Sequence, residues 1–213
     1  MSSGKPPDRF YMHESMVSRE QIRGLQQLVR HSAGEREIDA FISANRQLLT
    51  LPLDFARTGH HGAWVVPKAA IRSGIHGTVQ GMIPDFLVGG ESSDGISWLV
   101  VELKGAGARL FSGSGNKVRF SPDANRGICQ TLEYIDYCAR AQAHLRDEMQ
   151  LAGLREPMAY LILGREEETE SDRLRDLKAA WNRRMGGAVS IRSYDSLLRV
   201  ATRLAESYDR RGG

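Results

Sequence analysis

The segment ISWLVVELKG, residues 96–105, is apolar on both faces of a predicted strand. Alternate side chains of a strand point to opposite faces. One face carries Leu99, Val101 and Leu103, and the other carries Trp98 and Val100. A strand of this kind belongs to the centre of a sheet that is covered on both sides. The sequence therefore predicts a layered protein in which helices pack on a sheet.

The same segment ends in two charged residues, Glu102 and Lys104, which point to one side because they are two residues apart. An apolar strand over Ile83–Val88 precedes it, and the linker GGESSDG between them is rich in turn residues. Two strands with so short a connection are most simply an antiparallel hairpin. The start of the first strand then lies beside the end of the second, so we expect Asp85 next to Glu102.

Two carboxylates at the end of a buried hairpin repel each other, and one of them is expected to keep its proton. A divalent cation removes this repulsion, and oxygen ligands suit Mg²⁺ or Mn²⁺. Lys104 could then orient a water or contact a phosphate oxygen. A purely structural interpretation is also open, in which Lys104 neutralises Glu102 or Asp85, because the Glu-x-Lys pattern alone is common.

Periodicity and capping patterns predict the other elements. A capping box at Ser18 begins a helix that ends near His31, and a second box, Ser32 with Glu35, begins a helix that Pro52 ends. Further predicted elements are a strand over 63–67, a helix from Pro122 after the N-cap Ser121 to about Asp147, a strand over 158–163, a helix over 166–184, a strand over 189–192 and a last helix capped by Ser193 or Asp195. This order indicates an α/β or α+β protein.

Length and composition restrict the class of protein. The 213 residues suit one domain, which we place at 32–213, after an arm and helix over 1–31. No apolar run approaches the roughly 20 residues of a membrane span, and the first ten residues lack the apolar region of a signal peptide. Cys129 and Cys138 are expected to be free thiols, which favours a cytoplasmic location.

Three other polar residues carry little weight alone. Glu37 lies at the edge of the apolar stripe of the second predicted helix, where a solvated glutamate is the ordinary interpretation. Gln130 and Tyr134 are one turn apart and share a face of the long helix, as a surface or packing pair also would.

The glycine-rich segment 105–120 carries Arg109, Lys117 and Arg119. Contacts with phosphate groups and a merely solvated loop are both open for these residues. The net charge of +3 is compatible with a phosphate-bearing partner but does not require one.

Several alternative sites are disfavoured. His60, His61 and His76 have no acidic partners at metal-ligand spacing, so a loop is favoured over a zinc site. The glycines of segment 105–120 match neither a phosphate-binding loop nor a dinucleotide fingerprint. Cys129 has no nearby histidine pattern that would make it a nucleophile.

The chain resembles the PD-(D/E)XK nuclease superfamily in the order of its polar residues: Glu37, Asp85, Glu102-x-Lys104 and Gln130-x-x-x-Tyr134. Within the superfamily it is most similar to the nuclease domain of the Shedu anti-phage defence proteins. The segments that carry this resemblance, spread over roughly residues 34 to 205, are GEREIDAFISANRQLL, IPDFLV, WLVVELKG, RGICQTLEYIDY and YDSLLRVATRL. The stretch Lys104-Gly105-Ala106 is less typical of the family than Lys-Arg-Pro. The separate N-terminal domain of many such proteins is expected to be absent or reduced to the first 30 residues.

The resemblance implies a restriction-endonuclease-like core, with a mixed central sheet flanked by helices and the site at one end of the hairpin. It implies that Asp85, Glu102 and the Leu103 carbonyl hold the metal. It also implies that Glu37 is a further ligand or holds a water, that Lys104 assists the attacking water and that Gln130 orients substrate or water.

The implied activity is metal-dependent hydrolysis of phosphodiester bonds in DNA, with Mg²⁺ or Mn²⁺, by a homo-oligomeric anti-phage effector. The sequence leaves open whether RNA is also a substrate and whether the enzyme nicks one strand or cleaves both. It also leaves open whether the action is that of an endonuclease or an exonuclease. The alternative is a catalytically silent nuclease-fold module that binds nucleic acid or a partner protein. Intact Asp85, Glu102 and Lys104 favour the nuclease.

Overall fold

The structure is a computed structural model that describes residues 4–12, 17–71, 82–151, 153–185 and 187–212. It contains a five-stranded sheet with the order β1-β2-β3-β6-β7. The strands are β1 (Gly62–Pro67), β2 (Phe86–Ser92), β3 (Gly95–Leu103), β6 (Met158–Ile162) and β7 (Val189–Arg192). β1, β2 and β3 are antiparallel, whereas β3, β6 and β7 are parallel. The predicted mixed central sheet flanked by helices is confirmed.

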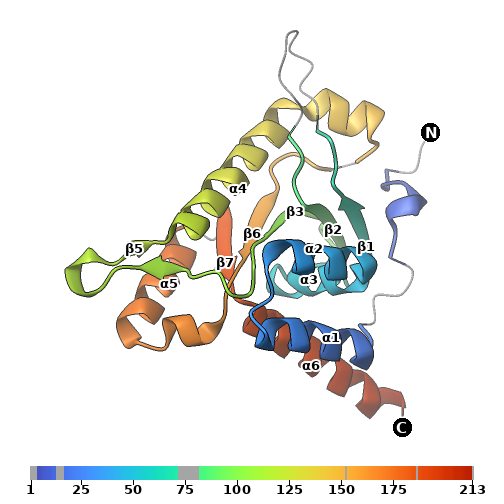
Figure 1. Cartoon of the computed structure of the whole chain (residues 1–213). Helices are drawn as coiled ribbons and strands as arrows, with labels where there is room; N and C mark the ends of the chain where they lie inside the picture. Colours follow the sequence, from blue (N-terminus) through green and yellow to red (C-terminus); the bar gives the residue numbers. More distant parts are fainter. Residues whose placement is uncertain (1–3, 13–16, 72–81, 152, 186, 213) are drawn as a thin grey trace.

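Helices cover both faces of the sheet (Figure 1). One face is covered by α1 (Arg19–Arg30), α2 (Glu35–Ala44), α3 (Leu51–Phe55) and α6 (Tyr194–Gly212). α4 (Pro122–Arg140) packs on the other face. The central strand β3 is buried on both sides as predicted, because Leu99 and Val101 belong to the first core and Trp98 and Val100 to the second.

The predicted hairpin of β2 and β3 is present, and its register runs from Phe86 opposite Val101 to Ser92 opposite Gly95. Its turn is shorter than the linker GGESSDG suggested, because the first four residues of that linker continue β2. Gly89 is needed for packing and not for a turn, since a Cβ there would lie 3.1 Å from the Trp98 ring. β2 therefore extends four residues beyond the predicted end.

The connection between α1 and α2 corrects one prediction. Ser18 caps α1 in the expected capping box. Ser32, however, closes α1 instead of opening α2. It has a left-handed φ of 54°, and the N–H of Ala33 donates to the Leu28 carbonyl in a Schellman arrangement. α2 begins after Gly34, so the Glu35 side chain is not used in a capping box.

Pro52 begins a helix and does not end one. α2 ends at Ala44, and the 3₁₀ turn η2 (Arg46–Thr50) leads into α3, where Pro52 occupies the first turn. A proline is tolerated there because the first N–H groups of a helix have no partner within the helix. The apolar residues Leu48 and Leu49 still reach the core, as their spacing predicted.

The glycine-rich segment after β3 forms an arm, which we define as residues 111–120. It contains β4 (Phe111–Ser112), the 3₁₀ turn η3 (Gly115–Lys117) and β5 (Arg119–Phe120). Figure 1 shows it extending beyond the end of the main sheet. The glycine-rich segment thus contains two short strands that its sequence pattern did not predict. The two aromatic rings of the arm stack at 5.4 Å, which stabilises the short ribbon.

The remaining elements lie close to their predicted positions. Ser121 caps α4 as expected, but α4 ends at Arg140, and a π-helical turn, η4 (His144–Glu148), follows. The predicted helix over 166–184 divides into a 3₁₀ turn, η5 (Glu166–Thr169), and α5 (Asp172–Met185). Ser193 caps α6 by accepting the N–H of Ser196.

The N-terminal arm is partly docked on the sheet. It forms the 3₁₀ turn η1 (Asp8–Phe10), and the N–H of Met12 donates to the carbonyl of Ala63 on edge strand β1. Cys129 and Cys138 are both free thiols, as predicted. Among the helices that the structure describes, none is long and apolar enough to cross a membrane.

Candidate active site at the ends of β2 and β3

The hairpin register brings Asp85 and Glu102 together. Phe86, the first residue of β2, pairs with Val101 of β3. Asp85, just before β2, therefore lies opposite Glu102. Asp85 is fixed there because its Oδ2 accepts the N–H of Leu103 at 2.9 Å. The proximity that the sequence predicted for the two carboxylates is thus present.

Glu102 is a buried carboxylate with two different oxygens. Its Oε1 accepts a hydrogen bond from Lys104 Nζ at 2.8 Å, whereas its Oε2 is buried and has no hydrogen-bond partner among the described residues. Burial, and then the negative charge of Asp85, raise the pKa of Glu102 to about 7, although Lys104 opposes the shift. The site therefore disfavours the ionised carboxylate unless a further cation is present.

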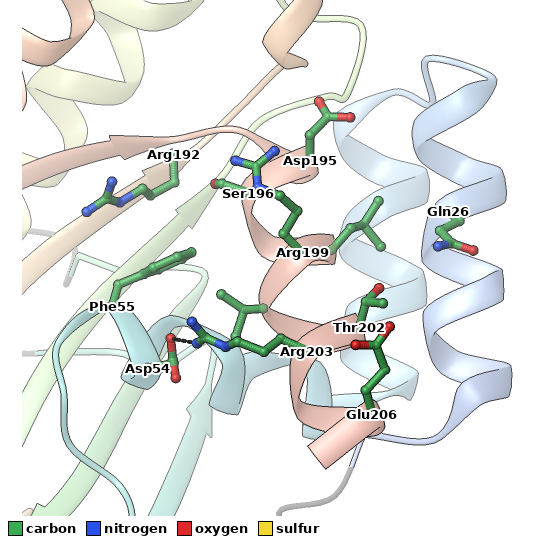
Figure 2. Close-up of a pocket in the computed structure, with 12 residues that line it drawn as sticks. Gln26, Asp54, Phe55, Arg192, Asp195, Ser196, Arg199, Thr202, Arg203 and Glu206 are labelled. Carbon is green, nitrogen blue, oxygen red and sulfur yellow. Dashed lines mark hydrogen bonds and ion pairs between the residues drawn. The ribbon is translucent and has the colours of Figure 1, made fainter. Parts of the chain in front are cut away.

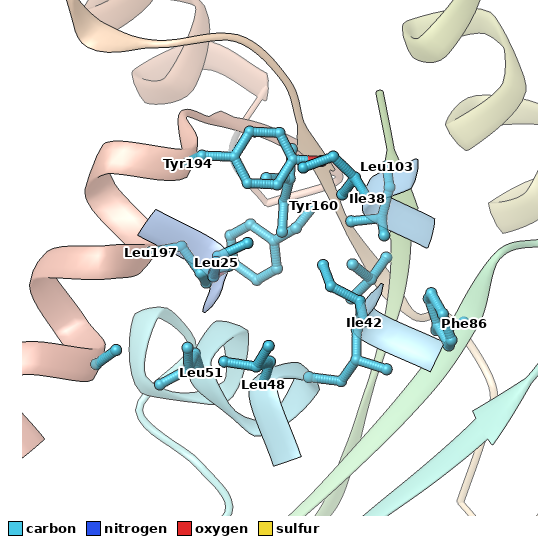
Figure 3. Packing of buried hydrophobic residues seen from close by; sticks show 14 of the residues in the cluster. Leu25, Ile38, Ile42, Leu48, Leu51, Phe86, Leu103, Tyr160, Tyr194 and Leu197 are labelled. Atoms are coloured by element: carbon cyan, nitrogen blue, oxygen red, sulfur yellow. The ribbon is translucent and has the colours of Figure 1, made fainter. Parts of the chain in front are cut away.

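Lys104 is enclosed, with 6% of its side chain exposed, and it pairs with Glu102 and with Glu35, whose Oε1 lies 3.3 Å from Nζ. Burial lowers the pKa of Lys104, but the two carboxylates more than offset this effect, so the net pKa lies above its usual value. The backbone is fixed as well, because the Tyr194 hydroxyl donates to the Lys104 carbonyl at 2.6 Å. Figure 3 shows Tyr194 packed in the core beside Leu103, at the end of β3.

The first turn of α2 reaches the site because the chain that follows β3 passes close to the start of this helix. A Cβ on Gly105 would lie 3.2 Å from the Ala33 carbonyl oxygen and from the Glu35 nitrogen. The N–H of Ala106 also donates to the Ala33 carbonyl at 2.8 Å. Gly105, which departs from the pattern typical of the resembled family, thus permits the close approach that places Glu35 beside Lys104.

Three residues of the site were not identified in the sequence: Glu35, Asp39 and Lys68. Lys68 Nζ lies 3.0 Å from Asp39 Oδ1 and 3.3 Å from Asp85 Oδ1. Glu35 and Asp39 are one turn apart and share a face of α2, a spacing that could have revealed them. The position of Lys68, just after β1, has no sequence signal because it depends on strand pairing.

Glu37 is not on the face of α2 that meets the site. It is exposed, and a separation of two residues places it about 200° around the helix from both Glu35 and Asp39. The contacts of the structure thus bring together Asp85, Glu102 and Lys104, but with Glu35 in place of Glu37.

α4 contributes Tyr134, as its position in the sequence pattern suggested. The Tyr134 hydroxyl donates to the Ile83 carbonyl at 3.3 Å. Burial, and then the charges of Glu102 and Asp85, raise the pKa of Tyr134 well above its usual value, so this hydroxyl lies in the field of both carboxylates. Gln130, one turn earlier, is half-buried, and its Oε1 is a buried atom that lacks a partner among the described residues.

The predicted phosphate contacts lie on or near the arm. Lys117 and Arg119 are exposed on η3 and β5, while Arg109, just before the arm, pairs with Glu168 at 3.0 Å. The described structure shows no ion pair between these three residues and the carboxylates of the site. His60 and His61 pack edge to face at 4.7 Å, and His76 lies outside the described residues.

The donors of this site fit a magnesium ion. Mg²⁺ is commonly bound by one or two carboxylates and keeps several waters. Asp85 and Glu102 supply two carboxylates, and the partnerless Oε2 of Glu102 is the buried atom that such an ion would satisfy. The described residues include no group of three or more His, Cys, Asp or Glu side chains arranged to hold a metal. Two carboxylates completed by water would meet the usual requirement of Mg²⁺.

A separate cavity of about 820 Å³ lies between α3, β7 and α6 (Figure 2). Its arginines are already engaged: Arg203 pairs with Asp54, Arg199 with Glu166, and Arg192 lies 4.8 Å from the Phe55 ring centre. The cavity includes none of the carboxylates or lysines of the hairpin site. Two of its three arginines are neutralised by carboxylates of the chain, so we do not take this cavity as the candidate active site.

Comparison with known proteins identifies one family. The family model described as Shedu protein SduA, C-terminal, matches residues 32–198. This match covers most of the chain and includes every residue of the hairpin site. No curated protein matches the chain.

Proposed function

Since the chain belongs to the Shedu SduA C-terminal family, we propose that it is a metal-dependent DNA nuclease of the PD-(D/E)XK type that acts in anti-phage defence. One observation carries this proposal. Glu102 is buried beside Asp85, and one of its oxygens has no partner within the described part of the chain, so the pair is suited to a cation. The mixed sheet, with the carboxylates at one end of an antiparallel hairpin, is consistent with a restriction-endonuclease-like core.

Mg²⁺, or Mn²⁺ in its place, would be held by Asp85 and Glu102, and by the Leu103 carbonyl that the resemblance implies. When bound, the ion would supply the charge that activates a water and neutralises the phosphate. Lys104 supports the attack on phosphorus, because its ammonium is fixed between Glu102 and Glu35 and stays protonated. It can therefore stabilise negative charge that develops beside Glu102.

The other residues are proposed to bind and orient the substrate. Gln130 orients substrate or water with its amide, and this role is supported by its buried Oε1, for which the described residues offer no partner. Arg109, Lys117 and Arg119 contact the phosphates of DNA that flank the cleaved bond. We further propose that the protein is cytoplasmic and forms a homo-oligomer, which would extend the short DNA contact that one domain offers.

The test is cleavage of supercoiled plasmid, linear duplex and single-stranded DNA, and of RNA, with Mg²⁺ and with EDTA. Asp85→Asn should abolish cleavage, because it removes one of the two carboxylates that hold the ion. The matched control is Asp94→Asn, the same change at the exposed turn of the same hairpin. Cleavage by Asp85→Asn at the wild-type rate would refute the assigned site. Binding without cleavage by the wild-type protein would favour the silent module.

A further inference from the structure

Lys68 is a second lysine of the site, and its surroundings differ from those of Lys104. Its ammonium bridges two carboxylates, at 3.0 Å from Asp39 and 3.3 Å from Asp85. About half of its side chain, 49%, is exposed, whereas Lys104 is enclosed. Of the two lysine side chains, that of Lys68 is therefore the more open to a bound substrate.

The backbone of Lys68 is built into the same corner. Its N–H donates to the Asp85 carbonyl at 2.9 Å, and its φ of 45° lies in the left-handed region, which a residue with a side chain seldom adopts. The same residue thus contacts Asp85 through both its backbone and its side chain. This double contact holds the ammonium on the Oδ1 side of Asp85, whereas the Leu103 N–H occupies Oδ2.

The charges of the site indicate how many cations it accepts. The carboxylates are those of Glu35, Asp39, Asp85 and Glu102, and the ammonium groups are those of Lys68 and Lys104. With all of these groups ionised, two negative charges remain in excess, which one divalent ion neutralises. A second ion would need a further pair of carboxylates, and Asp39 with Asp85 Oδ1 is the pair that Lys68 already bridges.

We propose that the Lys68 ammonium stands in the place of a second metal ion, so that the site takes one divalent cation and Lys68 positions the substrate phosphate with its own charge. This inference rests on the proposed nuclease function and specifies how that site binds metal and substrate. A purely structural role would make Lys68 an exposed ion pair, which contributes little to folding. Its removal would then change the affinity for the single ion but not the number of ions bound.

The experiment counts bound ions directly, by titrating the full chain with Mn²⁺ alone and measuring free Mn²⁺ by electron paramagnetic resonance. The wild-type protein should bind one Mn²⁺ per chain. Lys68→Met should bind two, because Asp39 and Asp85 Oδ1 become available, and Lys68→Arg should return to one because the charge is restored. Lys5→Met is the matched control, since Lys5 also forms a partly exposed ion pair, at 2.9 Å with Glu91, but away from the site.

The outcomes separate this inference from the function on which it rests. Two ions per wild-type chain, or a single ion in Lys68→Met whatever its affinity, would overturn the role of Lys68 and leave the nuclease proposal standing. No Mn²⁺ bound to the wild-type chain would overturn both. The melting temperature of Lys68→Met should stay within a few degrees of the wild-type value. The number of ions bound is then compared between two folded proteins.

Discussion

At the residue scale, two acidic residues in the first turn of α2, Glu35 and Glu37, differ in their distance from the site. Glu37 follows the order of the family pattern, but Glu35 is the residue whose carboxylate lies 3.3 Å from Lys104 Nζ. Residues two apart in a helix cannot face one point together. A functional role for Glu37 thus stays a prediction, and a comparison of two matched substitutions on α2 decides between the residues.

Glu35→Gln should lower the cleavage rate by about 10–100-fold, the usual effect of changing a residue that orients the groups of a metal site. Glu37→Gln should leave the rate unchanged, because that side chain is exposed and turned away. The measurement is the single-turnover cleavage rate at saturating Mg²⁺, with melting temperatures to confirm folding. A loss confined to Glu37→Gln would restore the assignment made from the sequence.

Glu102 gives the metal-free protein a defined pH dependence. Its pKa rises from 4.5 when unfolded to about 7 when folded, so the folded protein binds this proton more tightly. Stability from this group is complete below about pH 4.5 and is lost as the pH rises through 7. Between pH 5 and 7.5, the melting temperature of wild type should therefore fall relative to that of Glu102→Gln. The lost Lys104 contact gives only an offset between the two curves, and parallel curves would contradict the prediction.

At the element scale, the parts that the sequence predicted well are those with local signals. The double-faced apolar pattern of β3 and the short linker before it were sufficient to pair Asp85 with Glu102. The N-caps Ser18 and Ser121 were predictable because the cap and the N–H that it binds lie within one turn. The apolar pattern of β3 and the short linker located the carboxylate pair and Lys104.

The parts that were missed depend on contacts between distant segments. Ser32 and Glu35 have the spacing of a capping box, but the chain needs Ser32 to close α1 and uses Glu35 to bind Lys104, 69 residues away. Lys68 meets Asp39 only because β1 pairs with β2 and α2 packs above them. Capping patterns carry no information on such tertiary contacts. The capping box at Ser32 and Glu35 was therefore predicted wrongly, and Lys68 was not identified, although Glu35 and Lys68 both belong to the site.

At the scale of the whole molecule, the N-terminal helix shares the core of the domain that carries the site. α1 lies against α6, and Leu25 is fully buried in the same cluster as Ile38 and Leu103 (Figures 1 and 3). The family match begins at residue 32, and the division of the chain at residue 31 stays a prediction. The packing indicates that this division separates sequence segments and not independently folding units.

A substitution in α1 tests this interpretation. Leu25→Ala should lower the free energy of unfolding by about 2–5 kcal/mol, the range for removing a buried leucine side chain from a packed core. Gln27→Ala, two residues away on the exposed side of α1, should change it by less than about 0.5 kcal/mol. Urea unfolding, monitored by tryptophan fluorescence, reports the stability of the domain that carries the site. Trp64 and Trp98 on the sheet and Trp181 on α5 contribute to the signal. If α1 were only an appendage, Leu25→Ala would leave that transition at its wild-type midpoint; if α1 completes the core, the whole transition moves to lower urea and stays cooperative.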